Sequence, residues 1–266
     1  MDRNEAVLRE LNLYPLWHRR GAPVAEAVQV SGYAALTRPT QTVPAVTVAE
    51  PSAVPVAPVG VADKGRERRI GELDWPQLKA MVRDCTACKL RAGCTQTVFG
   101  AGDEQADWLF VGEGPGADED ARGEPFVGQA GKLLDNMLLA INLRRGKNVY
   151  IANIVKCRPP NDRNPEADEI ATCLPYLQRQ IELIKPRLIV ALGKTAATAL
   201  LGRDATLGSL RGMLHDYRGI PLVVTYHPAY LLRSPMEKAK AWQDLCLAVR
   251  ARHGEAQPSD EPKNGS

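Results

Sequence analysis

The stretch WLFVGEGPGADED, residues 108–120, is an apolar run that ends in a turn with three glycines and a cluster of carboxylates. Its first half, 108–114, is apolar up to Gly112, which is typical of a strand buried on both faces of a parallel sheet. Its second half puts glycine-rich, acidic backbone at the end of that strand. Because ligands of open parallel sheets bind at the carboxyl ends of the strands, this loop is the first candidate for a site.

Three more apolar segments repeat the pattern, and we expect strands over 149–155, 187–193 and 221–227. The apolar residues show helical periodicity between these strands, over 129–143, 166–184 and 194–201, and after the last strand, over 235–252. Alternating strands and helices predict an α/β fold. We expect a three-layer α/β/α architecture with a central, mostly parallel four-stranded sheet, plus a flexible N-terminal extension.

The composition divides the 266 residues into three parts. Residues 1–70 predict a short helix over 3–19 and a Pro/Ala-rich disordered linker, ending in the charged run DKGRERR, which we interpret as a solvated domain edge. Residues 71–252 form the compact domain. Residues 253–266 have the composition of a disordered tail.

Net charge, hydropathy and cysteine content narrow the class of protein. The net charge of +3 is weak evidence for a polyanionic partner, and no uncharged apolar stretch is long enough for a membrane span. The N-terminus lacks the apolar centre of a secretory signal, so we expect a cytoplasmic protein. Thiols stay reduced there, and the six cysteines therefore suggest metal binding or reactivity before disulfides.

Four cysteines form a frame with two close pairs. Cys85 and Cys88 make a C-x2-C, the 68 residues 89–156 follow, and Cys157 and Cys173 make a C-x15-C. Four thiolates from two distant regions suit either a structural zinc or an iron–sulfur cluster. The alternatives are four unrelated buried cysteines, or a set in which Cys94 serves as a ligand.

The glycine loop differs from a phosphate-binding loop. It matches neither the dinucleotide fingerprint nor the Walker A pattern, and Pro115 removes a backbone donor that a phosphate would need. Its carboxylates, among them Glu113 and Glu119, would repel a phosphate. Exposed amides and carboxylates at a strand end would instead bind a small polar heterocycle and stabilise a developing cation.

Three further residues are expected at the same edge of the sheet. Phe126 lies in a glycine-flanked loop, Asn153 interrupts an apolar strand near its carboxyl end, and His227 ends the last strand. Each has a simpler interpretation, as a core aromatic, a turn cap and a satisfied strand-end histidine. Together they indicate a pocket in which an amide reads the edge of a base.

These segments resemble the uracil-DNA glycosylase superfamily, specifically family 4, the iron–sulfur uracil-DNA glycosylases of bacteria and archaea. The likeness covers about residues 73–249. It rests on the cysteine frame and on the segments TVFGAG, VGEGPGADED, EPFVGQAGKLLD, NIVKCRPPNDRNP, LIVALGKTAA and HPAYLLR.

The resemblance implies a monofunctional hydrolase of base excision repair that releases uracil from single- and double-stranded DNA. It implies a [4Fe-4S] cluster on Cys85, Cys88, Cys157 and Cys173. The uracil-binding residues that it implies are Gly112, Gly114, Phe126, Asn153 and His227. The catalytic residues are Glu113, Glu119 and His227. The DNA-binding residues are Tyr230, Leu231 and Arg233, with Tyr230 or Leu231 filling the gap left by the flipped base.

One departure bears on mechanism. Better-known members of the superfamily carry an aspartate that positions water where this chain has Gly114, so Glu113 or Glu119 would take that task. The alternatives are the same fold acting on another deaminated base such as hypoxanthine, or a non-catalytic iron–sulfur protein that binds nucleic acid or carries electrons. We expect a monomer without membrane contact, whose N-terminal extension tethers a protein partner or is padding.

Overall fold

The computed structural model describes residues 64–254. The helix expected over 3–19, the proline-rich linker and residues 255–266 of the expected tail lie outside the described residues. None of the helices between residues 64 and 254 is long and apolar enough to cross a membrane.

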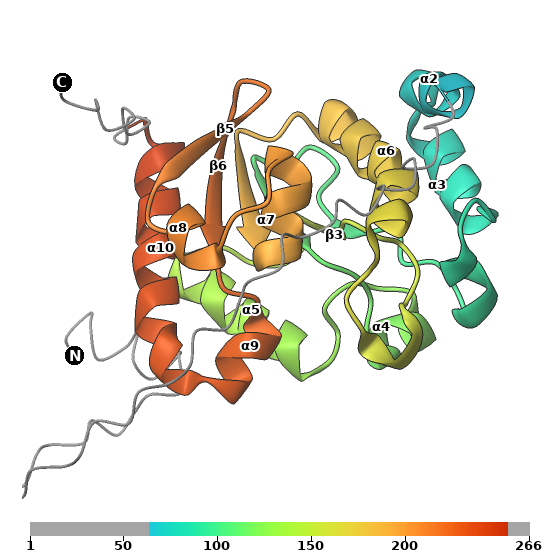
Figure 1. Ribbon diagram of the computed structural model, residues 1–266. Coiled ribbons are helices and arrows are strands. Elements are labelled where there is room, and N and C mark those ends of the chain that lie inside the picture. The colour runs from blue at the N-terminus through green and yellow to red at the C-terminus, as the bar shows by residue number, and fades with distance from the viewer. Residues whose placement is uncertain (1–63, 255–266) are drawn as a thin grey trace, which may run out of the picture.

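A sheet forms the centre of the structure, between the helices (Figure 1). It has six strands in the order β1-β3-β2-β4-β6-β5. Its four inner strands run parallel and are the four strands predicted from the sequence: β2 (Trp108–Gly112), β3 (Val149–Asn153), β4 (Leu188–Leu192) and β6 (Ile220–Thr225). Two short strands, not predicted, add antiparallel edges: β1 (Ala101–Gly102) beside β3 and β5 (Leu214–Tyr217) beside β6.

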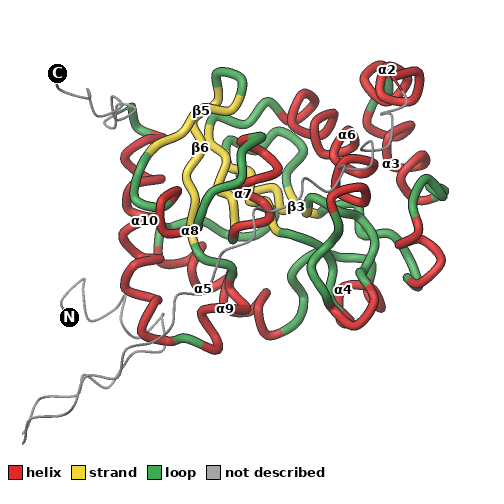
Figure 2. Tube along the Cα trace, viewed as in Figure 1, coloured by secondary structure: helices red, strands yellow, loops and turns green. Residues whose placement is uncertain are grey.

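Helices cover both faces of the sheet, so the α/β/α layering is confirmed (Figure 2). Along β2, Leu109 and Val111 face one core, whereas Trp108 and Phe110 face the other, as strand alternation requires. The helices of the first face are α2 (Lys64–Glu72), α3 (Trp75–Arg83), α6 (Ala167–Ile184), α7 (Lys194–Leu201) and α8 (Leu207–Leu210). Those of the second are α5 (Gln129–Ala140), α9 (Pro228–Arg233) and α10 (Lys238–Arg252).

The remaining helical elements are single turns in the connections. They are η1 (Lys89–Gly93), α4 (Ala117–Arg122), η2 (Pro160–Asp162) and η3 (Pro235–Glu237). The predicted helices correspond to α5, α6, α7 and α10, and each ends within three residues of its expected bounds.

The charged run before residue 71 is not only a solvated edge. It forms α2, which contacts α6, and its Ile70 is buried in the first core. Arg66 donates a hydrogen bond of 2.7 Å to the Thr172 carbonyl and lies 4.8 Å over the ring of Tyr176. A long cationic side chain can cover apolar surface in this way, and so a charged sequence can still form a packed helix.

Helix α5 packs closely against the loop that precedes it. A Cβ atom on Gly131 would lie 1.7 Å from the carbonyl oxygen of Phe126, so only glycine permits this approach. Phe126 has a φ of 55°, in the left-handed region that few residues other than glycine adopt. Two hydrogen bonds of 2.8 Å from Arg145 to the Pro125 and Phe126 carbonyls hold the loop there.

Replacing Gly131 with alanine should therefore lower the melting temperature by several degrees, because the loop must move away from the new methyl group. A strained insertion of this size costs about 1–3 kcal/mol, more than the gain in helix propensity of about 1 kcal/mol. Gly71→Ala is the control, since no atom lies within 4 Å of a Cβ added there. Equal melting temperatures of the two variants would contradict the expected clash.

Candidate active site

A cleft of about 350 Å³ opens at the carboxyl ends of the parallel strands. This volume lies within the range of small-molecule sites, about 300–1,000 Å³. The cleft is lined by the loops that follow β2, β3 and β6, together with Glu119 of α4 and Ala130 of α5. The predicted site residues that line it are Glu113, Gly114, Glu119, Phe126, His227, Tyr230 and Arg233.

Asn153 adjoins this wall without being one of the lining residues. Its side chain is 2% exposed, and its Oδ1 has no hydrogen-bond partner among residues 64–254. A Cβ atom on Gly112 would lie 2.5 Å from both Asn153 Oδ1 and Phe126 Cζ, so amide and ring converge over this glycine. A buried, unpaired carbonyl oxygen is costly unless a ligand or water pairs with it.

Phe126 and His227 lie next to each other in the lining of the cleft. Their ring centroids lie 5.4 Å apart with an angle of 32° between the planes. Phe126 comes from the loop before α5, and His227 is the N-cap of α9, directly after β6. The two rings and the Asn153 amide together make a partly aromatic, partly polar site for a flat heterocycle.

His227 is held in one tautomer. Its Nδ1 accepts a hydrogen bond of 3.2 Å from the Ala229 amide, which leaves the proton of the neutral ring on Nε2. Burial, with help from the positive charge of Arg233, lowers the pKa of His227 to about 4. The imidazole is therefore a neutral hydrogen-bond donor at physiological pH.

The carboxylates in the loop after β2 have different hydrogen-bond partners. Glu119 accepts hydrogen bonds from the backbone amides of Gly116 (3.1 Å), Val127 (2.8 Å) and Gly128 (3.0 Å). Asp120 is buried and accepts from the Thr95 amide at 2.9 Å, which ties α4 to the segment after the first cysteine pair. Both side chains thus fix loops.

Glu113 also lines the cleft, and its partner is a side chain rather than backbone. Its Oε2 accepts a hydrogen bond from the Thr195 hydroxyl of α7. Burial raises the pKa of the Glu113 carboxyl, and the bond from Thr195 opposes this increase. Of the two acids considered from the sequence, Glu119 bonds to three backbone amides and Glu113 to one side-chain hydroxyl.

The segment after His227 presents Tyr230 and Arg233 to the cleft as expected, but not Leu231. Leu231, expected at the DNA-facing surface, is 1% exposed and belongs to the second core. Its neighbours Tyr230 and Leu232 are 38% and 44% exposed. Residues one position apart point in different directions on a helix, and α9 turns Leu231 inward.

Sequence reasoning missed several residues of the site. Thr195 lies in the GKTA segment, which marked a strand end without indicating that one of its side chains bonds to Glu113. Asp162, Arg163 and Asn164 line the cleft from the loop after Cys157. Arg163 is anchored there by two hydrogen bonds, of 2.7 and 2.8 Å, to the Glu169 carboxylate.

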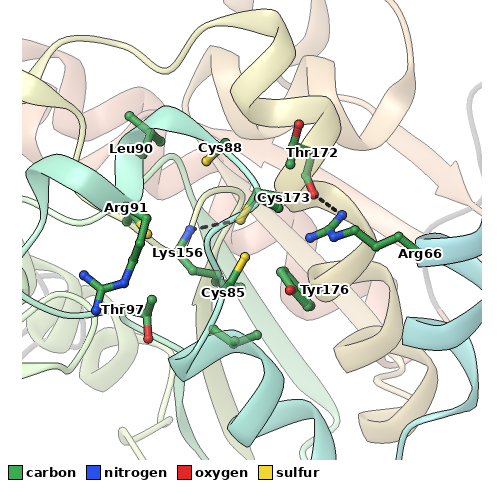
Figure 3. A pocket seen from close by; sticks show the side chains of 13 residues that line it. Arg66, Cys85, Cys88, Leu90, Arg91, Thr97, Lys156, Thr172, Cys173 and Tyr176 are labelled. Atoms are coloured by element: carbon green, nitrogen blue, oxygen red, sulfur yellow. Dashed lines mark hydrogen bonds between the residues drawn. The ribbon is translucent and has the colours of Figure 1, made fainter. Parts of the chain in front are cut away.

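A second cavity holds the four cysteines of the predicted frame (Figure 3). Cys85, Cys88 and Cys173 turn their sulfur atoms toward the same space, and Cys157 completes the lining. The Lys156 amide donates to the Cys173 sulfur at 3.3 Å. All four thiols are free of disulfides.

The chemistry of this cavity is that of an all-sulfur donor set. Neither a histidine nor a carboxylate lines it among the described residues, whereas Arg66, Arg91 and Lys156 add positive charge. Cys94 lies outside the lining, with the Arg91 guanidinium 3.2 Å from its carbonyl oxygen. Within residues 64–254 no three His, Cys, Asp or Glu side chains come close enough to hold a single metal ion.

Comparison with known proteins agrees with this geometry. A model of the Uracil DNA glycosylase superfamily matches residues 99–246. The chain is 42% identical over 183 residues to the type-4 uracil-DNA glycosylase of Pyrobaculum aerophilum, a match that covers 66% of this chain and 93% of the relative. Against the type-4 enzyme of Thermotoga maritima it is 47% identical over 155 residues, covering 58% and 80%.

A third type-4 enzyme, from Archaeoglobus fulgidus, is 43% identical over 172 residues, with 62% of this chain and 86% of the relative covered. The chain therefore belongs to the uracil DNA glycosylase superfamily. Within that superfamily it falls in the type-4 group, and the identification made from the sequence motifs is confirmed.

The pKa of His227 predicts a pH dependence of stability. Because this pKa is about 4 in the folded state and ordinarily 6.5, the unfolded chain takes up a proton first as the pH falls. The stability contribution of the neutral ring is complete above about pH 6.5 and is lost between about pH 6.5 and 4, by at most about 1.4 kcal/mol per pH unit.

Urea unfolding of the wild type and of His227→Gln across that pH range measures this difference. The free energy of unfolding of the wild type should fall more steeply with decreasing pH than that of the variant. Parallel curves would show that His227 titrates normally in the folded protein.

Proposed function

We propose that this chain is a uracil-DNA glycosylase, which takes up a uracil nucleotide flipped out of DNA and hydrolyses the bond between C1′ and N1 to leave an abasic site. Membership of the superfamily and the type-4 relatives support this activity, with DNA as the substrate. The structural observation that carries it is the buried, unpaired Oδ1 of Asn153 beside Phe126 and His227. A base must leave the helix to reach such a site.

Base recognition follows from the hydrogen-bonding groups. Phe126 stacks on the uracil ring, while Asn153 Oδ1 accepts from N3–H and its amide nitrogen donates to O4. Cytosine would direct an unprotonated N3 at the same oxygen and leave it unpaired. A bidentate amide contact of this kind discriminates by about 1–3 kcal/mol.

Bond cleavage leaves negative charge on the base and positive charge on the sugar. His227 donates a hydrogen bond from Nε2 to uracil O2, which stabilises the departing anion. Because the imidazole is neutral, no charged ring has to lose its hydration for this contact. The Glu113 carboxylate stabilises the sugar cation and orients the water, whose oxygen bonds to C1′. One water proton passes to Glu113, from which it is lost to solvent or to the base.

The DNA strand would cross the mouth of the cleft. We propose Tyr230 as the side chain that fills the gap left by the flipped base and Arg233 as a phosphate contact, because both line the cleft. Exposed Leu232 takes the place that the sequence had suggested for Leu231. Apolar and aromatic wedges of this type recur in proteins that distort duplexes.

The cysteine cavity is proposed to hold a [4Fe-4S] cluster on Cys85, Cys88, Cys157 and Cys173. Four thiols from two distant segments around one cavity, with no histidine or carboxylate among its lining residues, fit thiolate ligation of this kind. When bound, the cluster would supply a rigid link between these segments and leave the hydrolysis itself to the cleft.

We also propose the boundaries and state of the working unit. The glycosylase domain would begin with α2 rather than at residue 71, because α2 packs on α6 and places Arg66 at the cysteine cavity. It would act as a monomer in the cytoplasm, and residues 1–63 would be available to a protein partner.

Oligonucleotides that carry uracil, hypoxanthine or another damaged base test the activity. The wild type should release uracil from single- and double-stranded DNA and leave hypoxanthine in place. Asn153→Ala and His227→Ala should each reduce single-turnover release by about 10²–10³-fold, as removal of one preorganised donor does elsewhere. Asn136→Ala on α5, away from the cleft lining, is the control and should keep the wild-type rate.

Two outcomes would contradict the proposal. Absence of uracil release by protein that retains its metal would favour a redox or purely DNA-binding role. Preferred release of hypoxanthine would place the chain with the glycosylases of deaminated purines.

The cluster has its own test. Purified protein should be brown and contain iron and acid-labile sulfide in equal amounts, and Cys157→Ala should lose both. Cys246→Ala should keep them, because Cys246 lies on α10 and does not line the cavity. Stoichiometric zinc without sulfide would overturn the cofactor proposal while leaving the base pocket unaffected.

A further inference from the structure

We infer that Thr195 is a positioning residue of the reaction: its hydroxyl holds the Glu113 carboxylate so that one oxygen is anchored and the other faces the sugar of the flipped nucleotide. The inference rests on the proposed function and deepens it, since it explains how a carboxylate works where Gly114 offers none. It concerns a side chain that contacts neither the base nor the sugar.

The sheet brings Thr195 to Glu113 from the side of β2 opposite to Asn153. Strand β2 pairs with β3 on one edge and with β4 on the other. Glu113 directly follows β2, and Thr195 is the second residue of α7, which begins after β4 and the N-cap Gly193. The Thr195 Oγ1 donates to Glu113 Oε2.

The identity of the donor suits the task. Threonine is branched at Cβ and stiff at χ1, so the first turn of α7 fixes the position of its hydroxyl. A hydroxyl bonded to an ionised carboxylate makes a short, charge-assisted contact. With Oε2 anchored, Oε1 is the oxygen that can face C1′ and its water.

The half-buried setting explains why Glu113 needs such a donor. Burial raises the pKa of its carboxyl and the Thr195 hydroxyl opposes this. Glu119 has three backbone amides for its own carboxylate and so needs no side-chain donor. The titratable and charged groups that line the same cleft with Glu113 are Glu119, Asp162, Arg163, His227 and Arg233.

Single-turnover uracil release by Thr195→Val tests the inference. The variant keeps the shape and loses the donor, so we expect the rate at saturating enzyme to fall by about 10–100-fold, as for loss of one hydrogen bond to a charged group. Affinity for uracil-containing DNA should change little. The acidic limb of the pH–rate profile should move to higher pH, because the carboxylate has lost a donor, and Thr195→Ser should restore both rate and profile.

Thr198→Val is the matched control. Thr198 lies one turn further along α7 and donates to the Thr195 carbonyl at 3.3 Å, so its replacement alters the same helix without touching Glu113. It should keep the wild-type rate and pH profile. Circular dichroism and iron content report whether each variant is folded, and Thr195→Ala replaces Thr195→Val should the latter fail to fold.

A double-mutant cycle separates positioning from a general structural effect. Glu113→Gln/Thr195→Val should be no slower than Glu113→Gln alone, because Thr195 acts through Glu113. Independent, multiplying losses would overturn the inference, as would a wild-type rate in Thr195→Val.

Binding to DNA with a cationic pyrrolidine in place of the sugar gives a readout besides turnover. Thr195→Val should weaken this binding more than it weakens binding to a neutral abasic analogue, and equal losses would count against the inference. If the wild type releases no uracil, the proposed function itself fails; an active wild type with a fully active Thr195→Val overturns only the role of Thr195.

Discussion

The register between β2 and β3 is the constraint on which the site depends. Gly112 pairs with Asn153, and the ladder continues past both strands through Ile154 N–H to the Gly112 carbonyl at 2.9 Å and Val155 N–H to the Glu113 carbonyl at 3.1 Å. The loop with the acid is thereby fixed against the segment with the amide. A shift by one residue would turn Asn153 to the opposite face and separate it from Phe126.

The same segment joins the cleft to the cysteine cavity. Lys156 is buried, and its ammonium donates to the Asn153 carbonyl at 3.0 Å and to Gln180 Oε1 at 2.6 Å. Its own amide donates to the Cys173 sulfur, and Cys157 follows it in the chain. A group that ties the cysteines together would therefore also brace the backbone that carries Asn153, although it lies outside the base pocket.

The sequence was sufficient to predict the four parallel strands and the edge of the sheet at which the cleft lies. Parallel strands buried on both faces are continuous apolar runs, and their carboxyl ends meet at one edge whatever the details of the helices. It was not sufficient to predict which hydrogen-bond partners Glu113 and Glu119 would have. The partners of Glu119 come from residues 127–128 and that of Glu113 from α7, and such long-range contacts leave no local pattern.

Two other differences have local causes. Helix α9 has only six residues, too few for periodicity to show that Leu231 rather than Leu232 faces the core. Helix α2 has a charged sequence whose packing depends on one apolar residue, Ile70, and on the stem of Arg66. Composition alone therefore indicates solvent where the structure has a helix against α6.

Burial affects two ionisable groups of the cleft, His227 and Glu113, in opposite ways with respect to the tasks proposed for them. Burial favours the neutral form of both, lowering the pKa of His227 and raising that of Glu113. In the proposed mechanism His227 is a neutral donor, so burial and the amide of Ala229 both support its role. The same mechanism makes Glu113 an anion beside a sugar cation, so burial opposes its role and a dedicated donor is required. The hydroxyl of Thr195 can meet that requirement, because it stabilises the charged carboxylate and leaves its negative charge uncompensated. A lysine or arginine at the same place would neutralise that charge.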